Sequence, residues 1–322
     1  MRLGISTSCF PDTALPDVLR WAGASGFHAV EMECPLRAPS RLGRAVAGGT
    51  PAVPGRGEGW FSGGALQVQA LNGPARDALG AALEEANLAA SALTCGENVL
   101  ASDPDRARAV LEHLTRVVET AATLGVPVVC LRVGRVPSGS LGDSIAEFAR
   151  RAQPLVKQAE GAGVRLAVEN DPRCGPGAPG VEDQPADAAF APELWEKLFT
   201  HLRSEAVGLA LDPAPLVWLG VDPIAAVTDY AEKVFHLRAR DVEVFEARRQ
   251  DCSVLRPGGG WWRYRLPGLG EVDWRRMLDR LVELSYEGAV TIAHDDPVWG
   301  GSEERVKAGL TIARRHLAQF LP

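Results

Sequence analysis

Two carboxylates that close apolar runs are the first candidates for chemistry in this sequence. Glu169 ends the run Leu-Ala-Val-Glu, and Asp212 ends Gly-Leu-Ala-Leu-Asp, so both side chains are expected to be partly desolvated. Neighbouring carboxylates in such surroundings need a cation, a shared proton or a guanidinium. Their oxygens are of the kind that a divalent metal binds.

A third candidate is the stretch Val-Phe-His-Leu-Arg-Ala-Arg-Asp at residues 234–241. It is typical of a short strand in which His236, Arg238 and Arg240 share one face, because side chains alternate with a period of two. If that face points into a barrel, the arginines lie where charge is costly and must have partners there.

The elements that would position these residues alternate regularly along the chain. Eight strands are predicted, at residues 3–7, 29–32, 88–93, 126–133, 165–169, 207–212, 234–239 and 288–293. Eight helices are predicted, over residues 14–26, 76–87, 103–124, 143–163, 192–202, 222–233, 273–284 and 302–320. Regular β-then-α alternation favours a parallel sheet with helical crossovers, and eight units favour a single (β/α)8 TIM barrel over residues 1–322. A doubly wound sheet is the alternative, but no Gly-x-Gly-x-x-Gly follows the first strand.

In such a barrel the active site lies at the C-terminal ends of the strands. Charged residues expected there include Arg132 after the fourth strand and Asp295 after the last. Two irregular loops, at about 34–64 and 172–191, are long for plain connections. Trp261 and Trp262 lie in a further loop. Their side chains are as well suited to packing against the barrel as to stacking on a ligand.

Composition narrows the range of partners. The net charge of −7 and a pI near 5.5 argue against nucleic acid, whose binding surfaces are usually basic. No membrane span and no secretory leader are visible, and the six cysteines are scattered without a Cys-x-x-Cys pair. We therefore expect a cytoplasmic protein with reduced thiols.

Several segments resemble the xylose isomerase-like TIM barrels, the sugar phosphate isomerase/epimerase superfamily. The similar stretches are GFHAVEME (26–33), LASDPDRARAVLEHL (100–114), AATLGVPVV (121–129), LAVEN (166–170), LALDPAPLVWLGVDPI (209–224), FHLRARD (235–241), YRLPGLGEVDW (264–274) and YEGAVTIAHDDPVWGGSEERVKAGL (286–310). The resemblance implies a small carbohydrate-like ligand, and homo-oligomers are frequent in the family. It also implies one divalent ion (Mn, Mg or Zn), held by Glu, Asp, His and Glu from four strands.

This chain departs from the family's metal site. Glu169 and Asp212 stand at two of the ligand positions, but Arg238 replaces the histidine and Ala293 replaces the last glutamate. Pro215 stands at the position where the family has a substrate-binding histidine. Arginine stays protonated in proteins and cannot bind a metal. We therefore expect no metal cofactor unless the site has been rebuilt, and we expect Arg238 to pair with Glu169 and Asp212 instead.

Three hypotheses about function follow. The first is an isomerase or epimerase of sugar or inositol derivatives with a rebuilt site. The second is a catalytically silent barrel that binds an anionic or polyhydroxylated ligand through its arginines and the tryptophan loop. The third is a metal-independent lyase or dehydratase in which Glu169 or Asp295 acts as the base. His236 is expected to be a packed group one layer below Arg238.

Overall fold

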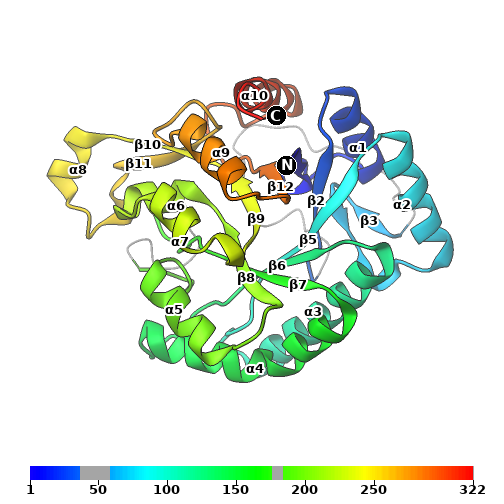
Figure 1. The fold of residues 1–322 in the computed structure, drawn as a ribbon, viewed down its shortest axis with the longest axis horizontal. Coiled ribbons are helices and arrows are strands. Elements are labelled where there is room, and N and C mark those ends of the chain that lie inside the picture. Colours follow the sequence, from blue (N-terminus) through cyan, green and yellow to red (C-terminus); the bar gives the residue numbers. More distant parts are fainter. Residues whose placement is uncertain (37–58, 176–183, 322) are drawn as a thin grey trace.

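A computed structural model describes residues 1–36, 59–175 and 184–321. In these residues, eight parallel strands close into a barrel (Figure 1). They are β1 (Arg2–Ser6), β2 (Ala29–Glu33), β5 (Ala89–Asn98), β6 (Val128–Arg132), β7 (Arg165–Glu169), β8 (Val207–Leu211), β9 (Val234–Ala239) and β12 (Ala289–Ile292). Their order around the barrel is β1, β12, β9, β8, β7, β6, β5, β2. The prediction of a single (β/α)8 barrel is confirmed.

Helices connect the strands and form the outer layer of the barrel (Figure 1). They are α1 (Leu15–Ala24), α2 (Gly73–Glu85), α3 (Pro104–Leu124), α4 (Leu141–Ala162), α5 (Pro192–His201), α7 (Pro223–Asp229), α9 (Trp274–Glu283) and α10 (Glu303–Leu317). Two short helices, α6 (Pro213–Leu219) and α8 (Glu246–Cys252), lie in connections. Short 3-10 turns occupy Thr7–Cys9, Val68–Ala70, Ala231–Lys233 and Pro257–Gly259. In the described parts of the chain, no helix is both long and apolar enough to cross a membrane.

The two longest helices have clear capping residues, and α3 begins and ends where its sequence signals predict. Asp103 caps α3 by accepting a hydrogen bond from an N–H of the first turn, and Gly125 ends the helix with a φ of 69°. Ser140 caps α4 in a reciprocal capping box with Asp143. With Ser140 as its cap, α4 starts at Leu141, two residues before the predicted start at residue 143.

Two small antiparallel hairpins were not predicted. β3 (Phe61–Ser62) pairs with β4 (Ala65–Leu66), and β10 (Asp241–Val244) pairs with β11 (Trp262–Arg265). The chain between β10 and β11, which contains α8, projects from the side of the barrel (Figure 1). Of the two irregular loops predicted at about 34–64 and 172–191, residues 37–58 and 176–183 lie outside the described residues.

The inner surface of the barrel combines small and long side chains. Ala92, Cys130, Ala167 and Ala210 belong to a separate buried cluster that also contains Val128 and Phe235. The period of two places the three alanines on the strand faces that carry Thr94, Glu169 and Asp212 farther along. These small residues leave room inside the barrel for the long side chains that reach in from β2 and β9. A shift of register between β8 and β9 pairs Ala210 with His236 after Leu209 with Val234, which leaves Phe235 as the extra residue of a bulge.

Candidate functional site

Arg238 of β9 lies in the middle of the barrel and joins two glutamates from other strands. Its Nε donates to Oε1 of Glu31 in β2 at 3.1 Å. Its Nη1 lies 3.0 Å from Oε2 of Glu169 in β7. Both carboxylates are buried, so the guanidinium balances charge that water does not reach.

Glu31 is held from below by a layer of hydroxyl and imidazole groups. Thr94 and Thr291 donate to its two oxygens at 2.7 Å, and Nε2 of His236 lies 2.9 Å from Oε2. Burial alone would raise the pKa of Glu31, but Arg238 and His236 outweigh burial and hold this pKa well below its ordinary range. His236 is therefore a packed group one layer below Arg238, as expected from the spacing.

Arg240 forms a second centre nearer the mouth of the barrel. Its guanidinium donates to three carboxylates at 2.7 Å: Asp212 after β8, Asp171 after β7 and Asp295 after β12. The ring of Tyr264 in β11 covers one side, with its centre 3.8 Å from Cζ of Arg240. The prediction that Arg238 pairs with both Glu169 and Asp212 is thus half wrong, because Arg240 takes Asp212.

The carboxylates around Arg240 differ in their acidity. Burial and the neighbouring charge of Asp171 raise the pKa of Asp212 to about 6, although Arg240 opposes the rise. Arg240 and Arg173 outweigh burial at Asp171 and lower its pKa. Burial is likewise outweighed by Arg240 at Asp295, whose pKa is lowered. Oδ1 of Asp212 also accepts the Ala214 N–H, so this carboxylate caps α6 as well.

Two glutamates at the ends of β7 and β2 keep carboxylate oxygens that no guanidinium contacts in the described residues. Oε2 of Glu169 is shared by Arg238 and Arg173, whereas its Oε1 is buried and has no hydrogen-bond partner among the described residues. Glu33 ends β2 next to Gly96, and within the described chain its carboxylate accepts no hydrogen bond. Burial, reinforced by the charges of Glu169 and Glu31, raises the pKa of Glu33 to about 7 against the opposing charge of Arg238.

The remaining predicted site residues lie apart from this network or at its edge. Arg132 pairs with Asp187 at 3.3 Å and donates to the Gly96 carbonyl at 3.2 Å. Asp295 keeps a side chain that is 44% exposed despite its contact with Arg240. Trp261 and Trp262 are 0% and 4% exposed.

Both tryptophans belong to an apolar cluster beside the barrel. The cluster contains Cys174, Ala214, Trp218, Val242, Trp261 and Trp262. The rings of Trp218 and Trp262 are stacked, with centroids 4.6 Å apart. This burial favours loop packing over ligand stacking.

The sequence reading missed four residues that complete the site. Asp171 and Arg173 follow Glu169 by two and four positions, a continuation of the strand's period of two that could have indicated them. Arg173 has a φ of 53°, uncommon for a residue with a Cβ, and its N–H donates to Asp171 Oδ1 at 2.8 Å. Tyr264 and Glu33 carried no comparable signal, because their roles depend on the β10–β11 hairpin and on burial.

The donor set of this mouth does not match a divalent-metal site. Glu169 and Asp212 occupy the family's ligand positions, but each is already bound by a guanidinium. Arg238 and Ala293 supply no lone pair at the other two positions. Across the described residues, no group of three or more His, Cys, Asp and Glu side chains is arranged to hold a metal ion.

Known proteins share this architecture. The family model described as xylose isomerase-like TIM barrel matches residues 19–316. The uncharacterized protein YfiH of Bacillus subtilis is 26% identical over 235 residues, which span 67% of this chain and 74% of that protein. An inosose dehydratase of Clostridium beijerinckii is 29% identical over 105 residues, which span 32% of this chain and 35% of that enzyme.

Solved structures agree in fold at lower identity. An IOLI protein with a bound zinc atom has a TM-score of 0.64 at 17% identity, over 100% of this chain and 99% of that one. A D-tagatose 3-epimerase-like protein has a TM-score of 0.64 at 15% identity, over 99% of this chain and 98% of that one. Together with the match over residues 19–316, the barrel shows that the chain belongs to the family of xylose isomerase-like TIM barrels.

Proposed function

We propose that the C-terminal mouth of the barrel binds a small polyhydroxylated or anionic carbohydrate-type ligand without a divalent metal. The observation that carries this proposal is the position of Arg238, whose guanidinium contacts Glu31 and Glu169. A divalent ion at 4 Å from that guanidinium would be repelled by about 4 kcal/mol per pair of unit charges at an effective dielectric constant of 20.

The same mouth retains groups that suit a hydroxylated ligand. Oε1 of Glu169 is an acceptor without a partner among the described residues, and Arg173 is a donor whose side chain is 36% exposed. A ligand hydroxyl can donate to the first, and a carbonyl or carboxylate oxygen can accept from the second.

If the site is catalytic, it favours elimination over epimerisation. A two-base epimerisation needs an acid or base on each face of the substrate, and Ala293 supplies neither. Dehydration needs one group that takes a proton from carbon and returns a proton to the departing hydroxyl, which leaves as water. Glu33 suits this role because its pKa of about 7 lets it accept and release a proton near neutral pH.

We propose Glu33 as the base in place of the two that the sequence suggested, Glu169 and Asp295. Asp295 and Glu169 both have a lowered pKa, because arginines outweigh burial at each of them. A carboxylate with a lowered pKa is a weaker base. The partial alignment with inosose dehydratases supports inososes as the first substrates to test. A barrel that binds such a ligand without turning it over is the second candidate.

The test compares the protein with variants that restore the family's ligands. Metal content by mass spectrometry and titration with Mn²⁺ or Zn²⁺ should show no stoichiometric metal in the wild type. The double variant Arg238→His/Ala293→Glu should bind one ion, and Ala293→Glu alone is the matched control. One tightly bound ion in the wild type would overturn the metal-free proposal.

Ligand binding is tested separately by calorimetry with inososes, inositols and ketohexoses, and turnover by NMR detection of water loss. Turnover that falls at least 100-fold in Glu33→Gln while binding persists would support the dehydratase. Binding without turnover would favour the silent barrel, and the absence of both would contradict the ligand class.

A further inference from the structure

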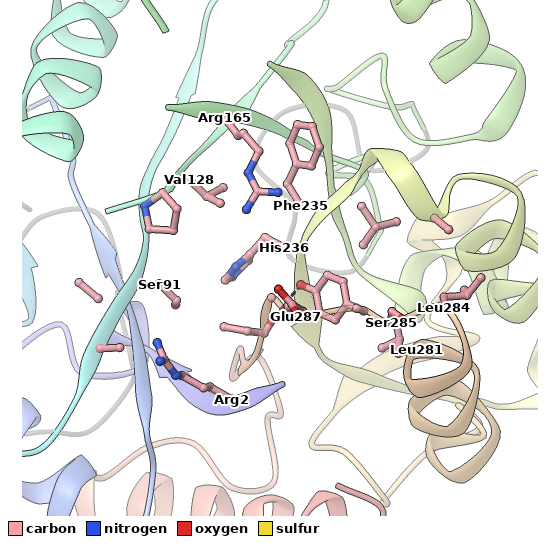
Figure 2. Close-up of a pocket in the computed structure, with 18 of the residues that line it drawn as sticks. Arg2, Ser91, Val128, Arg165, Phe235, His236, Leu281, Leu284, Ser285 and Glu287 are labelled. Carbon is pink, nitrogen blue, oxygen red and sulfur yellow. Dashed lines mark hydrogen bonds between the residues drawn. The ribbon is translucent and has the colours of Figure 1, made fainter. Parts of the chain in front are cut away.

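A cavity lies at the N-terminal end of the barrel, opposite the Arg240 network (Figure 2). Its volume is about 720 Å³, within the range of small-molecule sites. It exists because small residues occupy the strand starts there: Ala89, Ala90 and Ser91 in β5, and Gly288 and Ala289 at β12. No side chain at these positions is long enough to fill the barrel end.

Two arginines line this cavity from opposite sides of the barrel. Arg2 begins β1 and Arg165 begins β7, and these strands stand four places apart in a closed ring of eight. Figure 2 shows both side chains at the cavity, with His236 between them. The two cations therefore face one cavity from different strands, and both residues are also exposed to solvent.

Neither guanidinium has an anionic partner among the described residues, and neither donates a hydrogen bond there. The contrast is with Arg238 and Arg240 at the other end, each of which holds at least two carboxylates. Arg165 lies over the ring of Phe235, 4.9 Å from its centroid, which fixes its position without neutralising it. Glu287 is the acidic residue that lines the cavity, so the lining carries two arginine charges against one.

The other residues that line the cavity indicate which chemical groups a ligand would carry beside its negative charge. Val128, Phe235, Leu281 and Leu284 give apolar surface. The hydroxyl protons of Ser91 and Tyr286 are already donated to backbone carbonyls, so their oxygens present lone pairs rather than protons. Donors for an anion therefore come from the two arginines, whose planar groups suit carboxylate and phosphate oxygens.

We infer that the N-terminal cavity between Arg2 and Arg165 is a binding site for a small organic anion that carries a phosphate or carboxylate group. The inference is independent of the proposed function, because neither arginine contacts the Arg238 or Arg240 network. His236 separates the two sites: its ring lines the cavity, and its Nε2 contacts Glu31.

The experiment measures binding of defined probes at constant ionic strength. Inorganic phosphate, glucose 6-phosphate and succinate are titrated by calorimetry, with glucose as the uncharged control. At least one anion should bind saturably, and glucose should not. Phosphate alone would assign a phosphate site, and succinate alone would assign a carboxylate site.

Variants locate that binding. Arg2→Gln/Arg165→Gln should lower the affinity at least tenfold, with circular dichroism confirming the fold. Arg275→Gln removes one positive charge from the exposed surface of α9 and should change nothing. Equal affinity in the double variant, or no saturable binding by any anion, would overturn the inference. Because Arg238→His/Ala293→Glu leaves the cavity intact, that variant should retain anion binding whatever the outcome of the metal test.

Discussion

Arg238 Nη1 lies 3.0 Å from Glu169 Oε2, a contact that links β9 to β7, two places away in the ring of strands. In this family's metal site the equivalent positions are expected to share an ion, and here they share a salt bridge. The guanidinium also contacts Glu31, so removing it would leave buried Glu31 without a guanidinium and buried Glu169 with Arg173 alone.

We therefore expect Arg238→Met to lower the free energy of unfolding by about 3–5 kcal/mol at pH 7, the usual cost of breaking a buried pair. Urea denaturation measures this change. Adding Glu31→Gln to Arg238→Met should recover part of the loss, because one unpaired charge is then gone. A loss below about 1 kcal/mol for the single variant would show that the contact does not compensate the buried charge.

The pH dependence of the unfolding free energy should reveal the raised pKa of Glu33. Its pKa is about 7 in the folded protein and near 4.5 when unfolded, so between these values the folded state binds more protons. Stability contributed by this group is complete below about pH 4.5 and is lost as the pH rises through 7. Each pKa unit between the folded and unfolded states is worth about 1.4 kcal/mol of unfolding free energy. Partial solvation of Glu33 reduces its total contribution to roughly 1–3 kcal/mol.

Glu33→Gln removes this loss, so the variant should gain stability relative to the wild type between pH 4.5 and pH 8. Chemical denaturation across that range measures the difference. A wild-type to variant difference that stays constant with pH would contradict the raised pKa. Glu31 should change the unfolding free energy with pH in the opposite direction. Because its pKa is lowered in the folded protein, its contribution to stability is present above the pKa of the unfolded state and is lost in acid.

Tyr264 should stabilise Arg240 through its ring rather than its hydroxyl. The ring centre lies 3.8 Å from Arg240 Cζ, whereas the hydroxyl is 3.4 Å from Asp171 Oδ1, a long hydrogen bond. Tyr264→Phe should therefore cost less than about 1 kcal/mol in unfolding free energy, and Tyr264→Leu about 2 kcal/mol. Equal losses in thermal or urea unfolding would assign the effect to the hydroxyl.

The Trp218–Trp262 stack should be visible by spectroscopy and matter for folding. Trp262→Ala leaves a cavity in the buried cluster and should cost about 3–5 kcal/mol in urea denaturation. Trp262→Phe should be milder and should remove the near-ultraviolet dichroism of the stacked indoles. Trp21→Phe, outside this cluster, is the control and should preserve that signal. A signal unchanged in Trp262→Phe would mean that the rings are not stacked in solution.

The fold was predictable because each barrel strand and helix carries its own local signal. Apolar runs such as residues 165–169 indicated buried strands, and the caps at Asp103 and Ser140 agree with the helices that follow them. The hairpin of β10 and β11 escaped prediction because its short strands are paired through tertiary contacts around Trp262 rather than by a turn signal.

The site was predictable only in part, because partner choice depends on distances across the barrel. Alternation on β9 correctly placed Arg238 inside and near Glu169. It could not show that Arg240, just beyond the strand end at Ala239, would reach Asp212 together with carboxylates from two other loops. The contact of Glu31 with Arg238 also escaped prediction, because it joins two strands that lie far apart in the sequence.

The charge at the centre of this barrel is part of the polypeptide. Arg238 is attached to β9, so the positive group that Glu31 and Glu169 face needs no delivery after synthesis. A chelator cannot withdraw it, and its presence does not vary with the supply of any metal. The barrel therefore carries a permanent counter-ion whose occupancy is fixed at translation.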